Sequence, residues 1–227
     1  MMRGRPQVVH LYGMRGAGDP VIVSSGDGGW IHLGPQVADL LVAKGYFVVG
    51  FDVKAYLKSF TADSATLRPD DVPGDYKVLA EYAGRGSTRK PILIGVSEGA
   101  GLSVLAASDP ATKPLVGGVM ALGLPDRNEL GWRWKDSLIY VTHGVPNEPS
   151  FRAADVIDKV TPVPLAAIHS TRDEFVPLSV ITQLMARAKA PKHLWIVSAS
   201  DHRFSDRIEE FHRVLLESLE WMRSQPG

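Results

Sequence analysis

Short apolar runs alternate with longer amphipathic stretches along most of the chain. Runs that are bounded by Gly, Pro or polar residues predict buried strands, and apolar residues at helical spacing predict helices between them. The predicted strands are 7–12, 21–24, 46–51, 92–96, 116–122, 164–169 and 193–197. The predicted helices are 33–44, 73–84, 98–108, 177–189 and 205–223. This alternation predicts an α/β fold with a mostly parallel central sheet and helices on both faces.

The region 125–161 has the least regular pattern. Trp132 and Trp134 alternate with Arg133, which predicts an exposed edge strand over 132–140 with both indole rings on one face. Two interpretations remain open for these rings: a wall of an acyl or lipid site, or a satellite core under a long loop. The insert after Leu122 is short, so we expect a minimal cap and an open site.

Composition is typical of one compact domain, which we expect to span residues 1–227. The 25 basic and 25 acidic residues balance, and no basic run indicates nucleic acid or an anionic membrane as a partner. The absence of cysteine excludes disulfides and a cysteine nucleophile. No segment has the length and apolarity of a transmembrane span, and no signal-length apolar region follows residues 1–6. A cytoplasmic location follows unless the chain was trimmed; the oligomeric state is left open.

The stretch GVSEGAG, residues 95–101, follows an apolar run and has the pattern G-x-S-x-G. This pattern is typical of a nucleophile elbow, where a serine stands on a sharp turn between a strand and a helix. Gly95 and Gly99 permit the turn because neither carries a Cβ. Ser97 would lie at the helix N-terminus, where N–H groups favour developing negative charge. Alone, the pattern also fits a glycine-rich connection with an idle serine.

Polar loops follow two further predicted strands. Asp173 comes after strand 164–169, and His202 comes after strand 193–197. Because parallel strands place their carboxyl ends at one edge of the sheet, these residues are expected near Ser97. The chain order Ser97, Asp173, His202 is that of the α/β-hydrolases. We predict that His202 takes the Ser97 proton, while Asp173 fixes the tautomer and stabilises the imidazolium.

Other acids and histidines fit these roles less well. Asp126, at the end of another predicted strand, is the best substitute acid. Asp201 adjoins His202, but adjacent side chains rarely reach each other's ring nitrogens, and Asp206 suits the first turn of the last helix better. His169 lies in an apolar strand and is expected to be a core histidine. The remaining histidines lack metal-ligand spacing, so no metal site is predicted.

The segment SSGDGGW, residues 24–30, follows an early strand and is rich in glycine. It lacks the nucleotide-binding glycine motifs, although a plain loop remains an alternative. We predict that the backbone N–H groups of Asp27 and Glu98 form an oxyanion hole. The predicted substrate-binding residues are Gly26, Gly28, Gly29, Trp30 and Tyr56.

The segments SGDGGW, GYFVVGFDVKAYLKSF and LIGVSEGAG resemble the VirJ/AcvB bacterial virulence proteins of the α/β-hydrolase superfamily. The resemblance runs from about Val21 to the C-terminus. It implies an exported, periplasmic protein, with hydrolysis of aminoacylated phosphatidylglycerol as one activity in the group. It also implies the triad Ser97, Asp173 and His202. The chain departs from the family where an aromatic residue usually follows the serine and an aspartate comes three residues later; Glu98 and Gly101 stand there.

The side chain of Glu98 has two interpretations. It could be a helix-start residue that points to water, favoured by the helix dipole by about 0.3–1 kcal/mol. It could instead project into an open cleft, attract a cationic substrate group and raise the pKa of His202. In the first interpretation the side chain has no functional role.

These residues together predict a serine hydrolase that cleaves a carboxylic ester through an acyl-enzyme, without a cofactor. Aminoacyl and lipid esters are the candidate substrates. The alternative is a non-catalytic binding or secretion-accessory protein on the same scaffold, because a fold alone does not determine a function.

Overall fold

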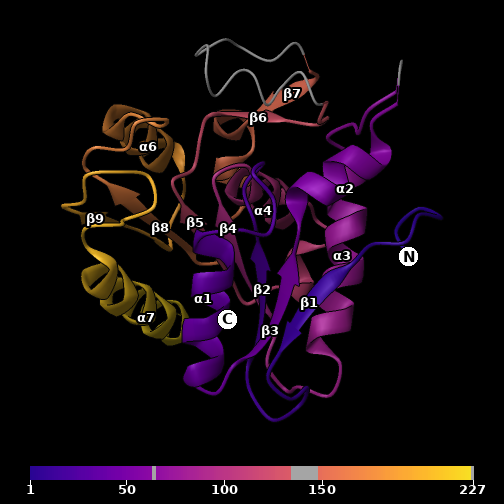
Figure 1. Ribbon diagram of the computed structural model, residues 1–227, viewed down its shortest axis with the longest axis horizontal. Helices are drawn as coiled ribbons and strands as arrows, with labels where there is room; N and C mark the ends of the chain where they lie inside the picture. Colours follow the sequence, from indigo (N-terminus) through magenta and orange to yellow (C-terminus); the bar gives the residue numbers. More distant parts are fainter. Residues whose placement is uncertain (63–64, 134–147, 226–227) are drawn as a thin grey trace.

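A seven-stranded sheet forms the centre of the computed structural model, which describes residues 1–62, 65–133 and 148–225 (Figure 1). The strand order is β1-β3-β2-β4-β5-β8-β9. The strands are β1 (Val9–Tyr12), β2 (Pro20–Ser24), β3 (Phe47–Phe51), β4 (Ile92–Val96), β5 (Gly118–Leu122), β8 (Leu165–Ser170) and β9 (Lys192–Val197). Strand β1 pairs antiparallel with β3, and the other pairings in this sheet are parallel. The carboxyl ends of six strands therefore meet at one edge.

Helices cover both faces of the sheet, as Figure 1 shows. They are α1 (Leu33–Ala43), α2 (Val53–Phe60), α3 (Asp71–Gly84), α4 (Glu98–Ser108), α6 (Leu178–Arg187) and α7 (Ile208–Ser224). Residues of α1 and α7 share one buried cluster with one face of the sheet. Residues of α2, α3, α4 and α6 share a second cluster with the opposite face. The predicted α/β architecture, a mostly parallel central sheet with helices on both faces, is confirmed. No helix among the described residues has the length and apolarity needed to cross a bilayer.

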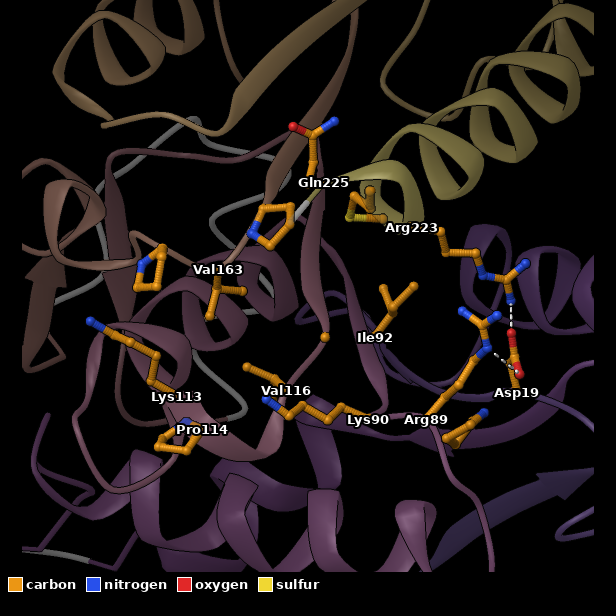
Figure 2. A pocket seen from close by; sticks show the side chains of 15 residues that line it. Asp19, Arg89, Lys90, Ile92, Lys113, Pro114, Val116, Val163, Arg223 and Gln225 are labelled. Atoms are coloured by element: carbon orange, nitrogen blue, oxygen red, sulfur yellow. Dashed lines mark hydrogen bonds and ion pairs between the residues drawn. The ribbon is translucent and has the colours of Figure 1, made fainter. Parts of the chain in front are cut away.

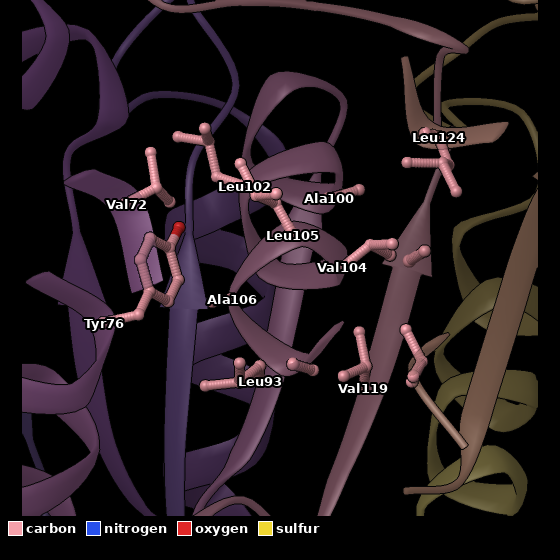
Figure 3. Close-up of a cluster of buried hydrophobic side chains, with 14 of the residues drawn as sticks. Val72, Tyr76, Leu93, Ala100, Leu102, Val104, Leu105, Ala106, Val119 and Leu124 are labelled. Atoms are coloured by element: carbon pink, nitrogen blue, oxygen red, sulfur yellow. The ribbon is translucent and has the colours of Figure 1, made fainter. Parts of the chain in front are cut away.

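Helix α4 is buried along its whole length. Leu102 and Leu105 pack with Tyr76 of α3, while Leu93 and Val119 approach from the sheet (Figure 3). A helix that is apolar all round belongs in an interior, where burial of each large apolar side chain stabilises the fold by roughly 1.5–3 kcal/mol. The helix that begins at the predicted elbow is therefore fixed on all sides.

Two parts of the fold differ from the sequence prediction. Helix α2 was not predicted; Asp52 caps it by accepting the Ala55 N–H at 2.9 Å. Between β5 and β8, a small hairpin pairs β6 (Arg127–Glu129) with β7 (Ser150–Arg152), followed by the short turns η3 (Ala153–Asp155) and η4 (Ile157–Lys159). Another short turn, η1 (Lys113–Leu115), precedes β5.

The predicted strand over 132–140 lies mostly outside the described residues, as does Trp134. Trp132 is described and is not part of a strand. Its ring packs against the core, with the Lys54 ammonium 4.6 Å from the ring centroid. This contact agrees with the satellite-core interpretation of Trp132.

Candidate active site

Ser97 stands on the turn between β4 and α4 in a backbone conformation that is rare for residues other than glycine. Its φ is 49° and its ψ is −115°. Such a conformation costs on the order of 1–3 kcal/mol and persists only when the surroundings impose it. Here the Ser97 N–H donates to the Leu122 carbonyl at 2.8 Å, which ties the turn to β5. The turn therefore has the geometry of a nucleophile elbow.

The glycines on either side of Ser97 are required by close backbone approach. A Cβ at Gly95 would lie 2.2 Å from the Gly99 carbonyl oxygen. A Cβ at Gly99 would lie 2.4 Å from the carbonyl oxygen of Ser25. The latter contact places α4 directly against the loop that follows β2.

Asp173 and His202 are hydrogen-bonded to each other. His202 Nδ1 lies 2.6 Å from Asp173 Oδ2, while Asp173 Oδ1 accepts the N–H groups of Phe175 at 2.9 Å and Val176 at 2.8 Å. Burial alone would raise the pKa of Asp173. The hydrogen bond and charge of His202, with the two backbone N–H groups, outweigh burial and hold that pKa below its ordinary value. An ionised acceptor at this position favours a proton on Nδ1 of the ring.

Three residues that the sequence reasoning missed hold His202 in place. Its backbone N–H donates to Glu174 Oε2 at 2.7 Å, and Phe175 meets the imidazole edge-on, 5.5 Å between ring centroids. Gly123, with φ of 60°, passes so close that a Cβ there would lie 2.4 Å from His202 Cε1. Glu174 and Phe175 directly follow Asp173, which is the signal that could have identified them.

Ser97 and His202 line the same cavity, about 380 Å³ in volume. Within the described ranges no hydrogen bond joins the Ser97 hydroxyl to His202, although catalytic hydrogen bonds are often loose before substrate binds. The remaining lining residues are Gly26, Asp27, Gly28, Gly29, Ile31, His32, Leu33, Gly34, Val96, Glu98, Pro125, Arg127, Phe175, Val176 and Arg203. The cavity thus brings together the predicted nucleophile, base and glycine-rich loop.

The loop 26–29 lies beside the nucleophile. A Cβ at Gly26 would lie 3.5 Å from the Ser97 Cβ, and a turn is closed by the Gly29 N–H, which donates to the Gly26 carbonyl at 3.1 Å. Burial raises the pKa of the Asp27 carboxyl, and the N–H groups of Asp27 itself and of Gly28 offset part of the rise. The sequence reasoning considered only the backbone of Asp27; its side chain is also part of the site.

Glu98 does not point to water. The residue is 7% exposed, and its carboxyl accepts the Glu129 N–H from β6. Burial raises the pKa of Glu98 well above its ordinary range, and the charges of Asp27 and Glu129 add to the rise. The interpretation of Glu98 as a solvated helix-start residue is therefore corrected: its carboxyl is buried beside the cavity and joined to the hairpin.

Two predicted pocket residues lie elsewhere. Trp30 is directed away from the cavity: it stacks on His10, 5.0 Å between centroids, and its Nε1 donates to Tyr12 Oη at 3.1 Å. Tyr56 is fully buried in α2, where its hydroxyl donates to Asp75 at 2.7 Å. Both aromatic rings bury more apolar surface by packing against the core than they would in the cavity. The prediction that Trp30 and Tyr56 bind substrate is therefore corrected.

The substitute acid Asp126 and a second serine near the site, Ser25, have other partners. Asp126 pairs with Arg152 at 2.7 Å and accepts the Ala154 N–H at 3.0 Å, so it supports the hairpin. Ser25 is buried, and its Oγ accepts the Val53 N–H at 3.0 Å. His169 is a buried strand residue, as expected, with Nε2 2.9 Å from the Val176 carbonyl oxygen.

Solved structures of several hydrolases resemble this chain in fold. A carboxylesterase of the ammonia-oxidizing thaumarchaeon Nitrososphaera gargenis has 15% identity and a TM-score of 0.70, with 97% of this chain and 96% of that chain covered. The monoacylglycerol lipase of Paleococcus ferrophilus has 18% identity and a TM-score of 0.63, with 98% and 100% covered. The α/β-hydrolase GrgF of Penicillium sp. sh18 has 13% identity and a TM-score of 0.70, with 97% and 99% covered.

Sequence comparisons identify the family. None of the curated proteins compared with the chain matches it significantly. The family model described as "Bacterial virulence protein (VirJ)" matches residues 19–222, which is most of the chain and includes Ser97, Asp173 and His202. The chain belongs to the VirJ family of bacterial virulence proteins.

Proposed function

We propose that the protein is a serine hydrolase that cleaves carboxylic esters through an acyl-enzyme. The observation that carries this proposal is the Asp173–His202 pair, 2.6 Å apart, which opens onto the same cavity as Ser97 on its left-handed turn. A strained serine conformation and a buried acid–histidine pair are each uncommon. Their convergence on one cavity is what acyl transfer requires.

In the proposed first step, His202 Nε2 takes the proton of the Ser97 hydroxyl as Oγ attacks the ester carbonyl carbon. Asp173 accepts the Nδ1–H and stabilises the imidazolium. The tetrahedral oxyanion is held by the N–H groups of Glu98 and Asp27. The Glu98 N–H has no acceptor within its helix because it belongs to the first turn. His202 then protonates the departing alcohol, leaving an acyl ester on Ser97.

In the second step, His202 takes a proton from water, whose oxygen attacks the acyl carbonyl. The carboxylic acid leaves as His202 returns the proton to Ser97 Oγ. Each proton transfer uses groups of this chain. The likeness to a carboxylesterase and a monoacylglycerol lipase supports ester hydrolysis as the reaction class.

The lining of the cavity supports two features of the substrate. Ile31 and Phe175 are large apolar side chains that are 52% and 49% exposed, which suits contact with a lipid chain. The carboxyls of Asp27 and Glu98 lie close enough to raise each other's energy when ionised. A substrate ammonium would relieve that repulsion, so we include aminoacyl esters in the proposal.

The reaction is tested by fluorophosphonate labelling and turnover of a short p-nitrophenyl ester. Wild type should label, and Ser97→Ala should lose labelling and about 10⁴-fold or more of kcat/KM. Ser224→Ala, at an exposed position on α7, is the matched control and should behave as wild type. Labelling that persists in Ser97→Ala would identify another nucleophile. A folded wild type that neither labels nor turns over any ester would favour the non-catalytic alternative.

The substrate charge is tested with a pair of esters that differ only by an ammonium in the acyl group. The ratio of kcat/KM for the cationic ester over the neutral ester should exceed one and fall in Asp27→Asn and in Glu98→Gln. The fall should be smaller at high salt because screening weakens the attraction. A ratio unchanged in both variants would remove aminoacyl esters from the proposal and leave ester hydrolysis intact.

A further inference from the structure

A second cavity lies at the opposite end of the sheet from Ser97 (Figure 2). Its walls come from the amino ends of neighbouring parallel strands: Pro20 begins β2, Ile92 begins β4, and Gly117 and Pro164 directly precede β5 and β8. The end of α7 and the turn η1 complete the walls. The volume is about 480 Å³, within the range of small-molecule sites.

The centre of this cavity is apolar. Ile92, Val116, Val163 and Met222 line it, and each has at most 7% of its surface exposed. Figure 2 shows Ile92, Val116 and Val163 grouped between the charged side chains. Hydrocarbon placed here would be removed from water at a gain of about 25 cal/mol for each Å² buried.

Cationic side chains surround this apolar centre. Among the described residues, Arg89, Lys90, Lys113 and Arg223 line the cavity, together with one carboxylate, that of Asp19. The one carboxylate cannot neutralise four cations, so the lining carries excess positive charge. A site of this kind selects an organic anion over a neutral or cationic molecule.

The cations differ in how far they are already engaged. Asp19 binds both guanidinium groups, with Arg89 Nε 3.5 Å from Oδ1 and Arg223 on the other oxygen. Lys113 Nζ donates to the carbonyl oxygens of Lys159 and Thr161, neutral partners that leave its charge uncompensated. Figure 2 shows Arg89 directed to Asp19 and Lys90 extending the opposite way, past Val116.

Lys90 is the cation available to a ligand. Its side chain is exposed, and in the part of the chain that the structure describes no acidic group lies within ion-pair distance. Its position beside Val116 places a positive charge at the border of the apolar centre. An amphiphile could therefore bind its head at Lys90 and its chain against the buried residues.

We propose that this cavity is a binding site for an aliphatic monocarboxylate, an anion with one carboxylate head and an unbranched apolar chain. The carboxylate would pair with Lys90, and the chain would contact Ile92, Val116 and Met222. Asp19 already pairs with Arg89 and Arg223, which leaves Lys90 to bind the carboxylate of a ligand. The proposal is independent of catalysis at Ser97.

Methionine methyl resonances provide a direct test. The chain has six methionines, and Met222 lines this cavity, whereas Met14 is a solvent-exposed residue outside its lining. Protein labelled with ¹³C at the methionine methyls is titrated with decanoate, and Met222→Leu identifies the reporter signal. The Met222 signal should shift saturably, and the Met14 signal should not. Decanol and decyltrimethylammonium should shift Met222 less at equal concentration.

Charge variants locate the carboxylate head. Lys90→Gln should weaken decanoate binding about threefold to fivefold, as expected for one partly exposed ion pair, and Lys90→Glu should weaken it further. Lys77→Glu is the matched control, because Lys77 is exposed on α3 and outside the cavity. It should leave the affinity unchanged.

Three results would overturn the proposal: no saturable shift of Met222, equal shifts with decanol, or equal affinities in wild type and Lys90→Glu. Thermal unfolding of each variant shows whether it is folded, so loss of binding is not confused with loss of structure. Because decanoate binding is measured without turnover, failure here would not bear on Ser97, and an inactive enzyme could still bind decanoate.

Discussion

The pKa values of two buried carboxyls at the candidate active site are shifted in opposite directions. Asp173, after β8, accepts three hydrogen bonds, one of them from His202, and its pKa is held below the ordinary value. Glu98, at the start of α4, accepts the Glu129 N–H among neighbouring acids, and its pKa is raised. Burial acts in the same direction on both. The charge and number of the partners therefore decide the direction in which each pKa is shifted.

This difference suggests a division of roles. An ionised Asp173 can orient His202 and balance the imidazolium. The raised pKa of Glu98 reduces the negative charge beside the developing oxyanion, and the ammonium group of a bound substrate would favour the ionised form again. Such pairs of acids with separated pKa values are a common feature of catalytic sites.

Of the substitutions that test the difference between Asp173 and Glu98, the one at Asp173 should have the largest effect on kcat. Asp173→Asn should lower kcat by about 10⁴-fold, because its amide oxygen would remain the acceptor for the Phe175 and Val176 N–H groups and its NH₂ would face His202 Nδ1, which favours the unproductive tautomer. Glu98→Gln should change kcat for a neutral ester less than about tenfold, because Gln keeps an oxygen for the Glu129 N–H. Asp126→Asn serves as a control outside the cavity. Equal losses in the first two variants would remove the distinction between the acids.

A smaller loss of kcat is expected when the His202 ring is displaced from Asp173. Gly123→Ala places a methyl group 2.4 Å from the present position of His202 Cε1, so the ring must move. Misplacement by about 1 Å can reduce the rate on the order of 10²-fold. Gly45→Ala is the matched control, with φ of 84° and open space around its Cβ. It should destabilise by a similar backbone strain and leave kcat unchanged; equal losses of kcat would point to general destabilisation.

The smallest expected effect concerns stability. Folding raises the pKa of Glu98 above its unfolded value, which is near 4.3. The contribution of Glu98 to the free energy of unfolding is therefore fully present below the unfolded pKa and is lost as pH rises through the folded pKa. Glu98→Gln should therefore gain stability relative to wild type as pH rises above about 4.3. Each unit of pKa difference is worth about 1.4 kcal/mol. Urea unfolding at several pH values measures this, and a difference independent of pH would contradict the raised pKa.

The opposite pH dependence is expected at Asp173. Its pKa is lowered by folding, so its contribution is present above the unfolded value and is lost as pH falls through the folded value. Asp173→Asn should therefore have a lower free energy of unfolding than wild type at neutral pH. The difference between the two proteins should decrease as the pH is lowered. Comparing the two variants in one urea series separates their contributions.

Local patterns were sufficient to predict the parallel strands and the elbow. A buried parallel strand is apolar on both faces, so 92–96 and 118–122 appear as continuous apolar runs. The glycines at 95 and 99 indicated the turn before its geometry was known. Helix α2 was missed because its eight residues are too few to establish a clear helical period, and only Asp52 separates it from the preceding strand.

Side-chain direction was not predictable from nearness in the sequence. Trp30 follows the glycine-rich loop, but Gly50 leaves room for its ring: a Cβ at Gly50 would lie 2.4 Å from the indole. That space is created by β3, some twenty residues later in the chain. The hairpin β6–β7 joins segments that are likewise distant in sequence, and the Glu98–Glu129 contact depends on it. Such contacts need the fold itself.

The contact between Gly99 and the carbonyl oxygens of Ser24 and Ser25 limits where the site tolerates substitution. The helix that carries the candidate nucleophile and the loop that carries the candidate oxyanion donor meet backbone to backbone, with no side chain between them. Neither can be remodelled without the other. Substitutions that change the shape of the cavity and leave this junction intact are therefore expected at the outer rim, around Ile31, Phe175 and Arg203.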